Sequence, residues 1–428
     1  MVATDKKIMM TVGVWLSRIV LGGTFVFSGF VKAVDVWGTI FKIEQYFAVW
    51  HLGVPRSLVL ALTLVLCITE FVVGVSIISG IYRKKAPVIT LLILSIFTLI
   101  TAYIVLFSPV EDCGCFGDAV TLSNTATFIK NVILLVINIF LLKVNVRCAG
   151  IFSRMIQWAV AIVSMFYIII VSMIGYMIQP VMDFRTFPEG TDLIAPENDD
   201  DIGFIYEKNG VERMFKADSL PQANSGWSFK KREESKESWA GLTITDVDGE
   251  DVTEDVINSE RAIVLLVIPE KEREDVAVTM YVNRIYEMSN LNDMDMAAVI
   301  GNAVEADIEE WRDISMAKYP IYSAEETQLK DLCRGEMALV YIIDGKVVNK
   351  YSMSALSNTK IRELETGEID FNNFLLFNGK HLFRWITETY LLLLILLFLI
   401  SAPWKIRTFI KRMTPHGRGD NSNVNKND

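Results

Sequence analysis

The sequence predicts a helical membrane protein that also carries a folded α/β domain. Hydrophobic residues make up 52% of the 428 residues and charged residues 21%, which is more apolar than an ordinary soluble protein. The apolar residues gather in stretches close to the length of about 20 residues that crosses a bilayer. Between Asp183 and Asp370 the chain is instead acidic, and its apolar residues follow strand and helix spacing.

Six stretches are predicted to be transmembrane helices, and the two shortest of them are the fourth and the sixth. They cover Ile8–Val31, Ser57–Ser79, Pro87–Phe107, Ala126–Leu142, Ile156–Ile178 and Trp385–Ala402. Lys6 and Lys7 resemble the start of a signal peptide. The apolar run behind them is too long for one, and no small-residue cleavage site follows, so we expect a retained helix.

Basic residues predict the orientation of these helices. The Lys and Arg clusters fall on one side of the membrane if every stretch crosses once, and the positive-inside rule makes that side cytoplasmic. The clusters are Lys6/Lys7, Arg83–Lys85, Arg147/Arg154 and Lys405/Arg407/Lys411/Arg412. We therefore expect a multi-pass protein of the bacterial inner membrane with both termini in the cytoplasm and the large domain in the periplasm. A net charge of −10 argues against nucleic acid as a partner.

Composition divides the chain into five segments. They are a four-helix membrane domain (1–150), a fifth transmembrane helix (151–180), an extracytoplasmic linker with a hairpin (181–238), an α/β domain (239–380), and a sixth transmembrane helix with a basic cytoplasmic tail (381–428). In the linker, Phe204–Tyr206 and Val211–Phe215 flank an Asn-Gly pair, which is typical of a tight hairpin. A second Asp-Gly turn is expected at Asp248-Gly249.

The α/β domain is predicted from alternating strand and helix patterns. Expected strands are Ala262–Ile268, Asp295–Ile300, Ala338–Ile343 and Lys346–Tyr351, and expected helices are Val276–Met288, Ile308–Met316 and Ser354–Thr366. Ser323, with Glu326 three residues later, is predicted to start a further helix through a capping box. This order favours a sheet with helices on both faces.

The most specific motif is the segment Glu111–Asp118, which contains Cys113-Gly114-Cys115. Two cysteines this close can form a small strained disulfide ring, and a labile disulfide suits a thiol-redox relay. A metal site of both thiolates with Asp112 and Asp118 is the second interpretation, although no nearby His supports it. The third is a structural disulfide or static turn. The flanking carboxylates would raise the pKa of the thiols.

Two charged residues lie inside the predicted helices. Arg18 is about ten residues into the first helix, and Glu70 about thirteen into the second. Ionisable residues at such depths usually face the bundle interior and have partners. The two residues are therefore candidates either for a polar site within the bundle or for a structural ion pair. Small residues are expected to allow close helix packing, namely Gly22, Gly23, Ser28 and Gly29 in the first helix and Gly74 in the second.

Residues 8–143 resemble the DoxX/MauE family of four-helix membrane proteins. The resemblance depends on Arg18 and Glu70, on the motif Asp112–Asp118, and on Gly22, Phe25, Ser28, Gly29, Lys32, Gly74, Gly114, Phe116 and Gly117. MauE resembles a maturation factor for a periplasmic, disulfide-rich amine dehydrogenase. DoxX relatives are linked to quinone-coupled oxidation or membrane redox complexes, which makes a quinone the candidate cofactor and an exported or membrane redox protein the candidate partner.

Residues 241–351 are similar to a degenerate thioredoxin-like domain. The similarity rests on the strand and helix order and on Leu332–Leu339, which resembles the stretch that holds the thioredoxin cis-proline. Two departures argue against thiol catalysis by this domain. The segment Pro269–Asp275 contains no cysteine, and Met337 stands at the proline position. Cys333 is either a packing residue or a residue on the face that would carry an active site.

The sequence therefore favours a DoxX/MauE-like protein in extracytoplasmic thiol–disulfide redox or the maturation of exported proteins. Cys113 and Cys115 would be the catalytic pair, and Arg18 and Glu70 would shape the bundle interior. The alternative is a non-enzymatic scaffold or assembly subunit whose outer domain binds a partner. A carrier that uses the bundle interior is the third class. The sequence leaves open whether the chain is itself an enzyme.

Overall fold

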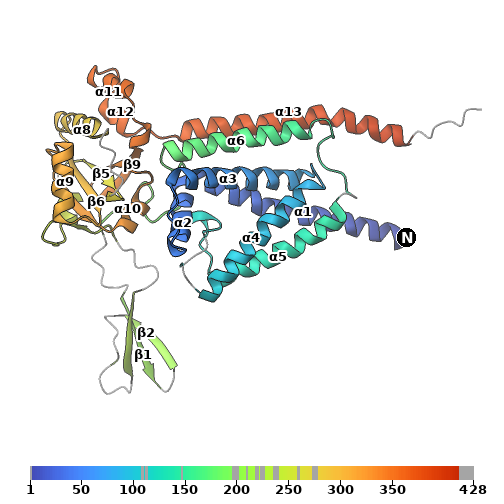
Figure 1. The fold of residues 1–428 in the computed structure, drawn as a ribbon, viewed down its shortest axis with the longest axis horizontal. Coiled ribbons are helices and arrows are strands. Elements are labelled where there is room, and N and C mark those ends of the chain that lie inside the picture. The colour runs from blue at the N-terminus through green and yellow to red at the C-terminus, as the bar shows by residue number, and fades with distance from the viewer. Residues whose placement is uncertain are drawn as a thin grey trace, which may run out of the picture. The chain divides into compact units, whose positions relative to one another are not determined.

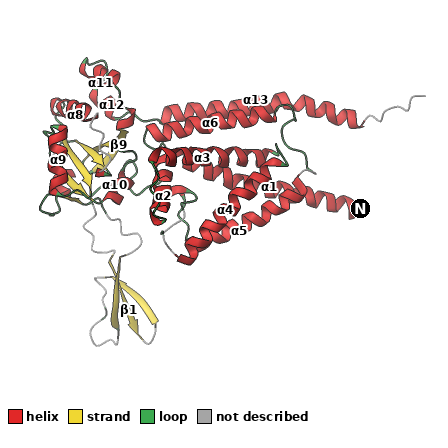
Figure 2. Cartoon of the chain, in the orientation of Figure 1, coloured by secondary structure: helices red, strands yellow, loops and turns green. Residues whose placement is uncertain are grey.

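The computed structural model describes residues 2–107, 110, 114–145, 148–194, 202–208, 211–216, 221, 227–234, 241–257, 261–271 and 278–413. The chain divides into two units, whose elements are drawn in Figures 1 and 2. The helical unit comprises Met1–Tyr176, Pro180–Met182 and Gly379–Asp428. The α/β unit comprises Met177–Gln179 and Asp183–Asn378, and it contains every strand that the structure describes.

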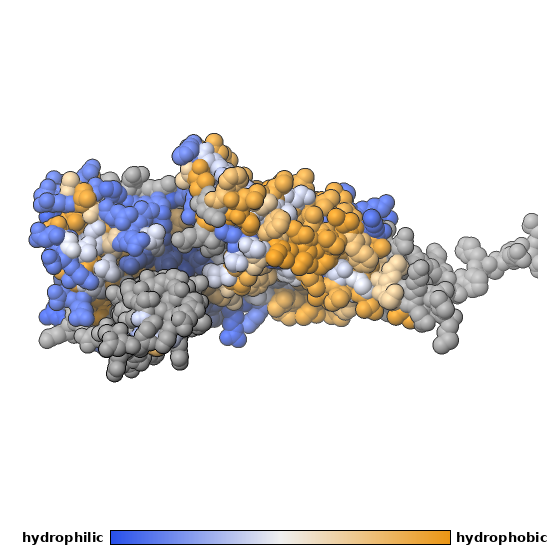
Figure 3. Space-filling view, turned by 90° about the horizontal axis from the view of Figure 1, so that it is seen from below, coloured by the Kyte–Doolittle hydropathy of each residue, from blue (hydrophilic) through white to orange (hydrophobic). Residues whose placement is uncertain are grey.

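The helical unit confirms the six predicted membrane helices. Among the described residues, six helices are long and apolar enough to cross a membrane. They are α1 (Val2–Val34), α3 (Arg56–Ser79), α4 (Lys85–Phe107), α5 (Asn124–Val144), α6 (Gln157–Met177) and α13 (Lys380–Met413). Hydrophobic residues gather on the surface of these helices, as Figure 3 shows. The protein is therefore a membrane protein whose helices contact lipid.

Helices α1 and α3 pack with their backbones in close contact. A β-carbon on Gly29 would lie 2.6 Å from the backbone nitrogen of Phe71, and one on Gly22 would lie 2.8 Å from the carbonyl oxygen of Gly74. No residue other than glycine fits these positions without moving a helix. The predicted role of glycines in helix packing is thus confirmed for Gly22, Gly29 and Gly74, whereas Gly23 has no neighbour this close.

A short helix, α2 (Val36–Val49), lies between the first two membrane helices, where the sequence predicts no transmembrane span. Asp35 caps it by accepting a hydrogen bond from the backbone nitrogen of Gly38 at 2.9 Å. Its buried face places Trp37 and Ile40 in a cluster with Val59 of α3. With 14 residues, α2 is too short to resemble a membrane span, so a search for spans does not find it.

The α/β unit is built on a six-stranded sheet with the strand order β4-β7-β6-β5-β8-β9. The strands are β4 (Ile244–Thr245), β5 (Ile263–Ile268), β6 (Asp295–Gly301), β7 (Ile321–Ala324), β8 (Ala338–Ile343) and β9 (Lys346–Ser352). Strands β5, β6 and β7 are parallel, and β8 and β9 form an antiparallel hairpin beside β5. This arrangement is that of a thioredoxin-like domain, as the sequence predicts.

Helices cover both faces of this sheet. One face packs against α8 (Thr279–Leu291), α9 (Glu305–Ser315), α11 (Asn358–Glu365) and α12 (Phe371–Leu375), and the other against α7 (Thr253–Ile257) and α10 (Glu326–Leu332). Strand β5 is buried along its whole length because its alternate residues enter both cores. The predicted sheet with helices on both faces is therefore confirmed.

Two local predictions differ from the structure. Ser323 does not cap a helix: it lies in strand β7, and α10 begins at Glu326 with Glu325 before it. The serine is instead held in the sheet because its backbone pairs with Ile300 of β6. The region assigned to a linker also contributes to the α/β core. Phe187 and Leu193 are buried there, and the Leu193 nitrogen donates to the Gly345 carbonyl at 2.8 Å.

A second, three-stranded sheet contains the predicted hairpin. Strands β1 (Ile202–Lys208) and β2 (Val211–Lys216) pair antiparallel, which confirms the hairpin, although its turn residues 209 and 210 lie outside the described residues. A third strand, β3 (Ser228–Glu234), pairs with β1. Its sequence, Ser-Phe-Lys-Lys-Arg-Glu-Glu, is mostly charged, so it does not show the alternation that predicts a strand.

Candidate functional site

A buried ion pair lies between helices α1 and α3. The Lys32 ammonium is 2.8 Å from Oε2 and 3.1 Å from Oε1 of Glu70. Both side chains are buried, with 4% and 1% of their surface exposed. Glu70 lies about 20 Å along helix α3 from Arg56, the first residue of that helix, at a helical rise of 1.5 Å per residue. Because a single buried charge is costly inside a membrane protein, each residue stabilises the other there.

Arg18 belongs to a different part of the bundle, which corrects the expectation that Arg18 and Glu70 shape one polar site. Its guanidinium donates to Oδ1 of Asn145 at 2.8 Å and to the carbonyls of Asn145, Cys148 and Ala149 at 3.0–3.3 Å. The physical reason is distance along α1, since Arg18 and Lys32 are about 20 Å apart at the helical rise. Arg18 therefore holds the segment after α5 against the bundle.

Ser28 connects the ion pair to the loop between α4 and α5. Its hydroxyl accepts a hydrogen bond from the Lys32 ammonium at 2.6 Å and donates one to the carbonyl oxygen of Cys115 at 2.8 Å. Ser28 and Lys32 are four residues apart, so they lie on the same face of α1. Ser28, Lys32 and Glu70 therefore form one buried network, called here the Lys32 network, that ends at the backbone of Cys115.

The loop itself turns through two glycines with left-handed backbone angles. Gly114 has φ +61° and Gly117 has φ +54°, and the Gly117 nitrogen donates to the Gly114 carbonyl at 3.1 Å. A β-carbon on Gly114 would lie 2.7 Å from Cγ of Lys42, so the α2 side chain packs against this turn. Asp112 and Cys113 lie outside the described residues, and the disulfide ring that includes Cys113 stays a prediction.

Phe116 anchors the loop to the bundle. Its ring meets that of Phe27 edge-on with centroids 5.5 Å apart, and the Lys130 ammonium of α5 lies 4.0 Å from its centroid. A cation over a ring face is attracted by the ring quadrupole. Asp118 is exposed next to this anchor. The sequence motif around the cysteines therefore serves in part to attach the loop to α1 and α5.

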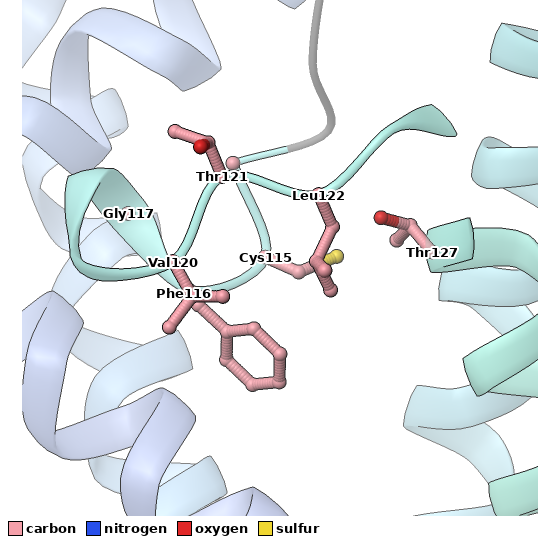
Figure 4. Close-up of a pocket in the computed structure, with 8 residues that line it drawn as sticks. Cys115, Phe116, Gly117, Val120, Thr121, Leu122 and Thr127 are labelled. Atoms are coloured by element: carbon pink, nitrogen blue, oxygen red, sulfur yellow. The ribbon is translucent and has the colours of Figure 1, made fainter. Parts of the chain in front are cut away.

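Two small cavities meet at Cys115. One is lined by Ser28, Glu70, Cys115, Phe116 and Lys130, together with Thr24, Phe25, Leu94, Phe97, Asn131 and Leu134. The other lies on the loop side, and Figure 4 shows the Cys115 sulfur turned toward its lining residues Leu122 and Thr127. Cys115 is partly exposed. A thiol at this position lies between the buried network and the loop surface.

Metal binding gains no support from the described residues. None of them forms a group of three or more His, Cys, Asp or Glu side chains that could hold a metal ion. The metal site considered from the sequence used Asp112 and Cys113, which lie outside the described part of the chain. It stays untested as a whole, and no step below involves a metal.

An apolar groove between α1, α3, α6 and α13 is the place where a quinone would be sought. Its lining is hydrocarbon except for Ser79 and Tyr390. Both hydroxyls already have partners, because Ser79 donates to the Val75 carbonyl at 2.6 Å and Tyr390 hydrogen-bonds Ser164 at 3.0 Å. A quinone headgroup needs donors for its carbonyl oxygens. The groove therefore does not fit a quinone headgroup.

The α/β unit contains a second buried charge cluster, beside Cys333. Asp183 accepts hydrogen bonds from Arg185 at 2.6 and 2.7 Å and from the Lys350 ammonium at 2.9 Å. Burial alone would raise the pKa of Asp183, but the charges of Arg185 and Lys350 lower it to about 2. Burial, with the Arg185 charge, lowers the pKa of Lys350 to about 8. This cluster fixes the chain after α6 onto strand β9.

Cys333 itself is fully buried in the core of the α/β unit. Burial raises the pKa of its thiol to about 11 despite the nearby charges of Arg185 and Lys350. The backbone of the next residue, Arg334, is held by the Gln179 amide, which both donates to and accepts from it. Met337, at the position of the thioredoxin cis-proline, is also buried. Of the two interpretations of Cys333, the structure supports the packing residue.

The helices and this site define a polytopic membrane protein with an ion pair buried inside its helical bundle. Residues 10–144 match the family model described as methylamine utilisation protein MauE, so this part of the chain is similar to that family of membrane proteins. Residues 201–237, which include the three-stranded sheet, match a family model described as a domain of unknown function, DUF8463. A search of curated proteins finds no match.

Among solved structures, the chain is similar to a solution structure of a candidate protein disulfide isomerase from Bacteroides thetaiotaomicron. The identity is 16%, the match covers 33% of this chain and 90% of the other, and the TM-score is 0.24. The strand order β6-β5-β8-β9, with β5 parallel to β6 and antiparallel to β8, is the order of a thioredoxin-like sheet.

Sequence reasoning missed the partner of Glu70. Lys32 entered only as part of the family motif, because the predicted helix ended at Val31, one residue before it, whereas α1 continues to Val34. The signal was present, since Ser28 and Lys32 have the spacing of one helical face. Lys42 and Lys130 were also missed. They come from α2 and α5, and only the fold brings them to the loop.

Proposed function

We propose that the protein acts in extracytoplasmic thiol–disulfide redox chemistry that serves the maturation of exported proteins, with Cys113 and Cys115 as the reactive pair. In this proposal both termini lie in the bacterial cytoplasm, and the α4–α5 loop and the α/β unit lie in the periplasm. The pattern of Lys and Arg supports this orientation. Disulfides persist in that compartment, so a cysteine pair there has a suitable environment.

The observation that carries the proposal is the attachment of Cys115 to the Lys32 network. A loop that needed only to be rigid could be fixed by apolar contacts such as that of Phe116 with Phe27. Here the cysteine backbone is instead bonded to Ser28, and a cavity beside it reaches Glu70. Ionisable residues buried in a membrane bundle are costly and usually mark a functional site. The hydrogen bond between Ser28 and the Cys115 backbone supports a functional role for this cysteine.

The α/β unit would serve as the part that binds the exported partner. It has a thioredoxin-like sheet, but the segment 269–275 contains no cysteine, and Cys333 is buried. A domain without an accessible thiol cannot exchange disulfides itself. Its role in the proposal is therefore to hold the substrate, while the loop supplies the thiols.

The alternative is a membrane scaffold whose α/β unit binds a partner and whose cysteine loop is structural. The buried state of Cys333 is compatible with it, because neither role of the α/β unit needs that thiol. The two proposals differ in one respect. Only the redox protein passes through a mixed disulfide with its partner.

The test is a trapping experiment in cells. Cys115→Ser removes one thiol of the pair, so a mixed disulfide between Cys113 and a partner should persist, and Cys113→Ser tests the opposite assignment. The measurement is a non-reducing gel after acid quenching, with protein abundance recorded alongside. Cys148→Ser, which changes a buried cysteine outside the loop, is the matched control. Normal abundance without an adduct in either loop variant would support the scaffold instead.

A further inference from the structure

The apolar groove of the helical unit lies between helices α1 and α3 on one side and α6 and α13 on the other. Its volume is about 390 Å³, and its wall is formed mainly by aliphatic and aromatic side chains, among them Val26, Val75 and Leu394. The four helices belong to one unit, and each is long and apolar enough to cross a membrane. The groove therefore belongs to the part of the chain that lies in the hydrocarbon of a bilayer.

Aromatic rings close one end of this groove. Phe71 of α3 and Tyr390 of α13 have ring centroids 6.2 Å apart, and Tyr390 stacks on Tyr167 of α6 at 4.1 Å. From Phe71 and Tyr390 the lining continues along the same helices to Ser79 and Phe398. Each of these lies eight residues further along its helix, which is about 12 Å at the helical rise. The helices thus touch at the aromatic end and leave the groove between them over the following two turns.

A lipid acyl chain is the occupant that this lining fits. The hydroxyls of Ser79 and Tyr390 already have partners within the bundle, so the wall offers little to water or to a polar group. An empty groove would leave its wall without van der Waals contacts on one side. Ile395 and Phe398 line the groove and are 55% and 46% exposed, so it opens toward the bilayer. Residues 414–428 do not suit the groove, because almost all of them are polar or glycine.

The other end of the groove is bordered by basic residues. There the backbone nitrogen of Ile151 donates to the Ser79 carbonyl at 2.6 Å, and both residues belong to the lining. This bond places the turn after α3 beside the segment that precedes α6. Lys84 follows in that turn and Arg154 in that segment, and both side chains are exposed. Two cations are therefore available where a chain in the groove would end.

Carboxylates from the same segments do not offset this positive charge. The sequence contains no Asp or Glu between residues 71 and 110 or between residues 119 and 182. Arg83 adds a third cation, and its guanidinium is fixed at this end by a 2.8 Å hydrogen bond to the Cys148 carbonyl. Basic pockets between membrane helices attract anionic lipid headgroups. The charge at this end therefore favours a negatively charged headgroup over a zwitterionic one.

We propose that the groove binds one acyl chain of an anionic phospholipid, whose phosphate lies against Lys84 and Arg154. The inference is independent of the redox function proposed above, because the cysteine loop takes no part in it. The bound chain differs from the lipid around any membrane helix, since four helices hold it and a charged end selects its headgroup. It fills the space that separates α6 and α13 from α1 and α3.

The first experiment tests the headgroup. The full chain is purified in detergent and titrated with phosphatidylglycerol or phosphatidylcholine of the same acyl chains, and native mass spectrometry measures the fraction that carries one lipid. The anionic lipid should bind about 25-fold more tightly, and Lys84→Gln or Arg154→Gln should each reduce this preference about fivefold. The matched control is Lys143→Gln, which changes an exposed lysine at the end of α5 and should leave the preference unchanged.

The second experiment tests the groove. Leu394→Trp places a larger side chain in the lining, so the affinity for both lipids should fall at least about tenfold. The matched control, Leu392→Trp, lies two positions earlier on α13, where the side chain is 65% exposed and outside the lining, and it should bind as the wild type does. Gel filtration shows whether each tryptophan variant is folded. The glutamine variants change exposed residues only, so they test the proposal even if Leu394→Trp does not fold.

Three results would overturn the proposal. Equal affinity of the wild type for the two lipids would contradict the anionic headgroup, and so would a loss in Lys143→Gln as large as that in Arg154→Gln. A folded Leu394→Trp variant with wild-type affinity would contradict the acyl chain in the groove. None of these results depends on the trapping experiment, which concerns only the cysteines.

Discussion

The helical unit and the α/β unit each place a cysteine near a lysine that is bonded to a carboxylate, yet the two cysteines differ in access. Cys115 is partly exposed and lines two cavities, and its backbone is bonded to Ser28. Cys333 is fully buried, and burial raises the pKa of its thiol to about 11 although Lys350 and Arg185 are near. Nearby cations therefore do not by themselves make a cysteine reactive.

The carboxylates of the two clusters also have different partners. Glu70 has one cation, Lys32, so the pair is neutral as a whole. Asp183 has two, Arg185 and Lys350, and the cluster has one positive charge in excess. Burial, together with the charge of Arg185, lowers the pKa of Lys350 to about 8, while Cys333 stays protonated at neutral pH. Desolvation outweighs the attraction of the cations at a thiol with no access to water.

The sharpest test of this comparison is the reactivity of the two thiols in the native chain. Cys333 can be alkylated only after the α/β core opens, which we expect to cost at least about 4 kcal/mol. Its rate should therefore be at least about a thousandfold below that of Cys115 in reduced protein. The measurement is alkylation with iodoacetamide, followed by mass spectrometry of each cysteine peptide. Comparable rates would show that Cys333 is accessible and would remove the contrast.

The next test concerns the structural role of the Asp183 cluster. Asp183→Asn leaves Arg185 and Lys350 without their carboxylate, and breaking a buried pair in this way costs about 3 kcal/mol of unfolding free energy. Pulse proteolysis of the full chain in urea measures the loss. The matched control is Glu287→Gln, which breaks an exposed pair with Arg284 and should leave the stability unchanged. Equal effects would mean that the buried cluster is not stabilising.

The smallest expected effect is a dependence on acid pH. The pKa of Asp183 is about 2 in the folded chain and 3.8 when unfolded, so its stabilisation is complete above pH 4. It should be lost as pH falls from about 4 to about 2, a change of about 2 kcal/mol. Pepsin pulse proteolysis of the α/β unit within the full chain follows this window. The Asp183→Asn variant should not show this loss of stability as the pH falls. If the variant lost as much stability as the wild type in this pH range, Asp183 would be excluded as the cause.

The fold follows from the sequence where one periodic signal dominates. The six membrane helices and strand β5 are long apolar runs, and their positions are predicted to within a few residues. Helix α2 and strand β3 have weak patterns, since the first is short and the second is mostly charged. The sequence around Ser323 matches a capping box, but the residue lies in strand β7, which pairs with β6. A local capping pattern contains no information about that pairing, so the prediction for Ser323 was wrong.

The candidate site was predicted in part. The cysteine motif was singled out by its residue types, and Glu70 by its position deep inside a predicted membrane helix. The ion pair between Glu70 and Lys32 was not predicted. Two cations, Arg18 and Lys32, lie on the same helix, and sequence depth alone favoured the one placed well inside the predicted span. The close approach at Gly29 brings the Lys32 end of α1 to Glu70. Such a choice depends on the register between two helices, which the sequence of either helix does not contain.

The contacts of Arg18 also have a consequence for how the chain is made. Its hydrogen-bond acceptors lie 127 or more positions later in the sequence, whereas Glu70 follows Lys32 by only 38. At a synthesis rate of about 5–20 residues per second, the acceptors of Arg18 emerge on the order of 10 s after it. During that interval the hydrogen bonds that Arg18 makes to Asn145, Cys148 and Ala149 in the folded bundle cannot form. The packing of α1 is therefore completed only after the segment that follows α5 has been synthesised.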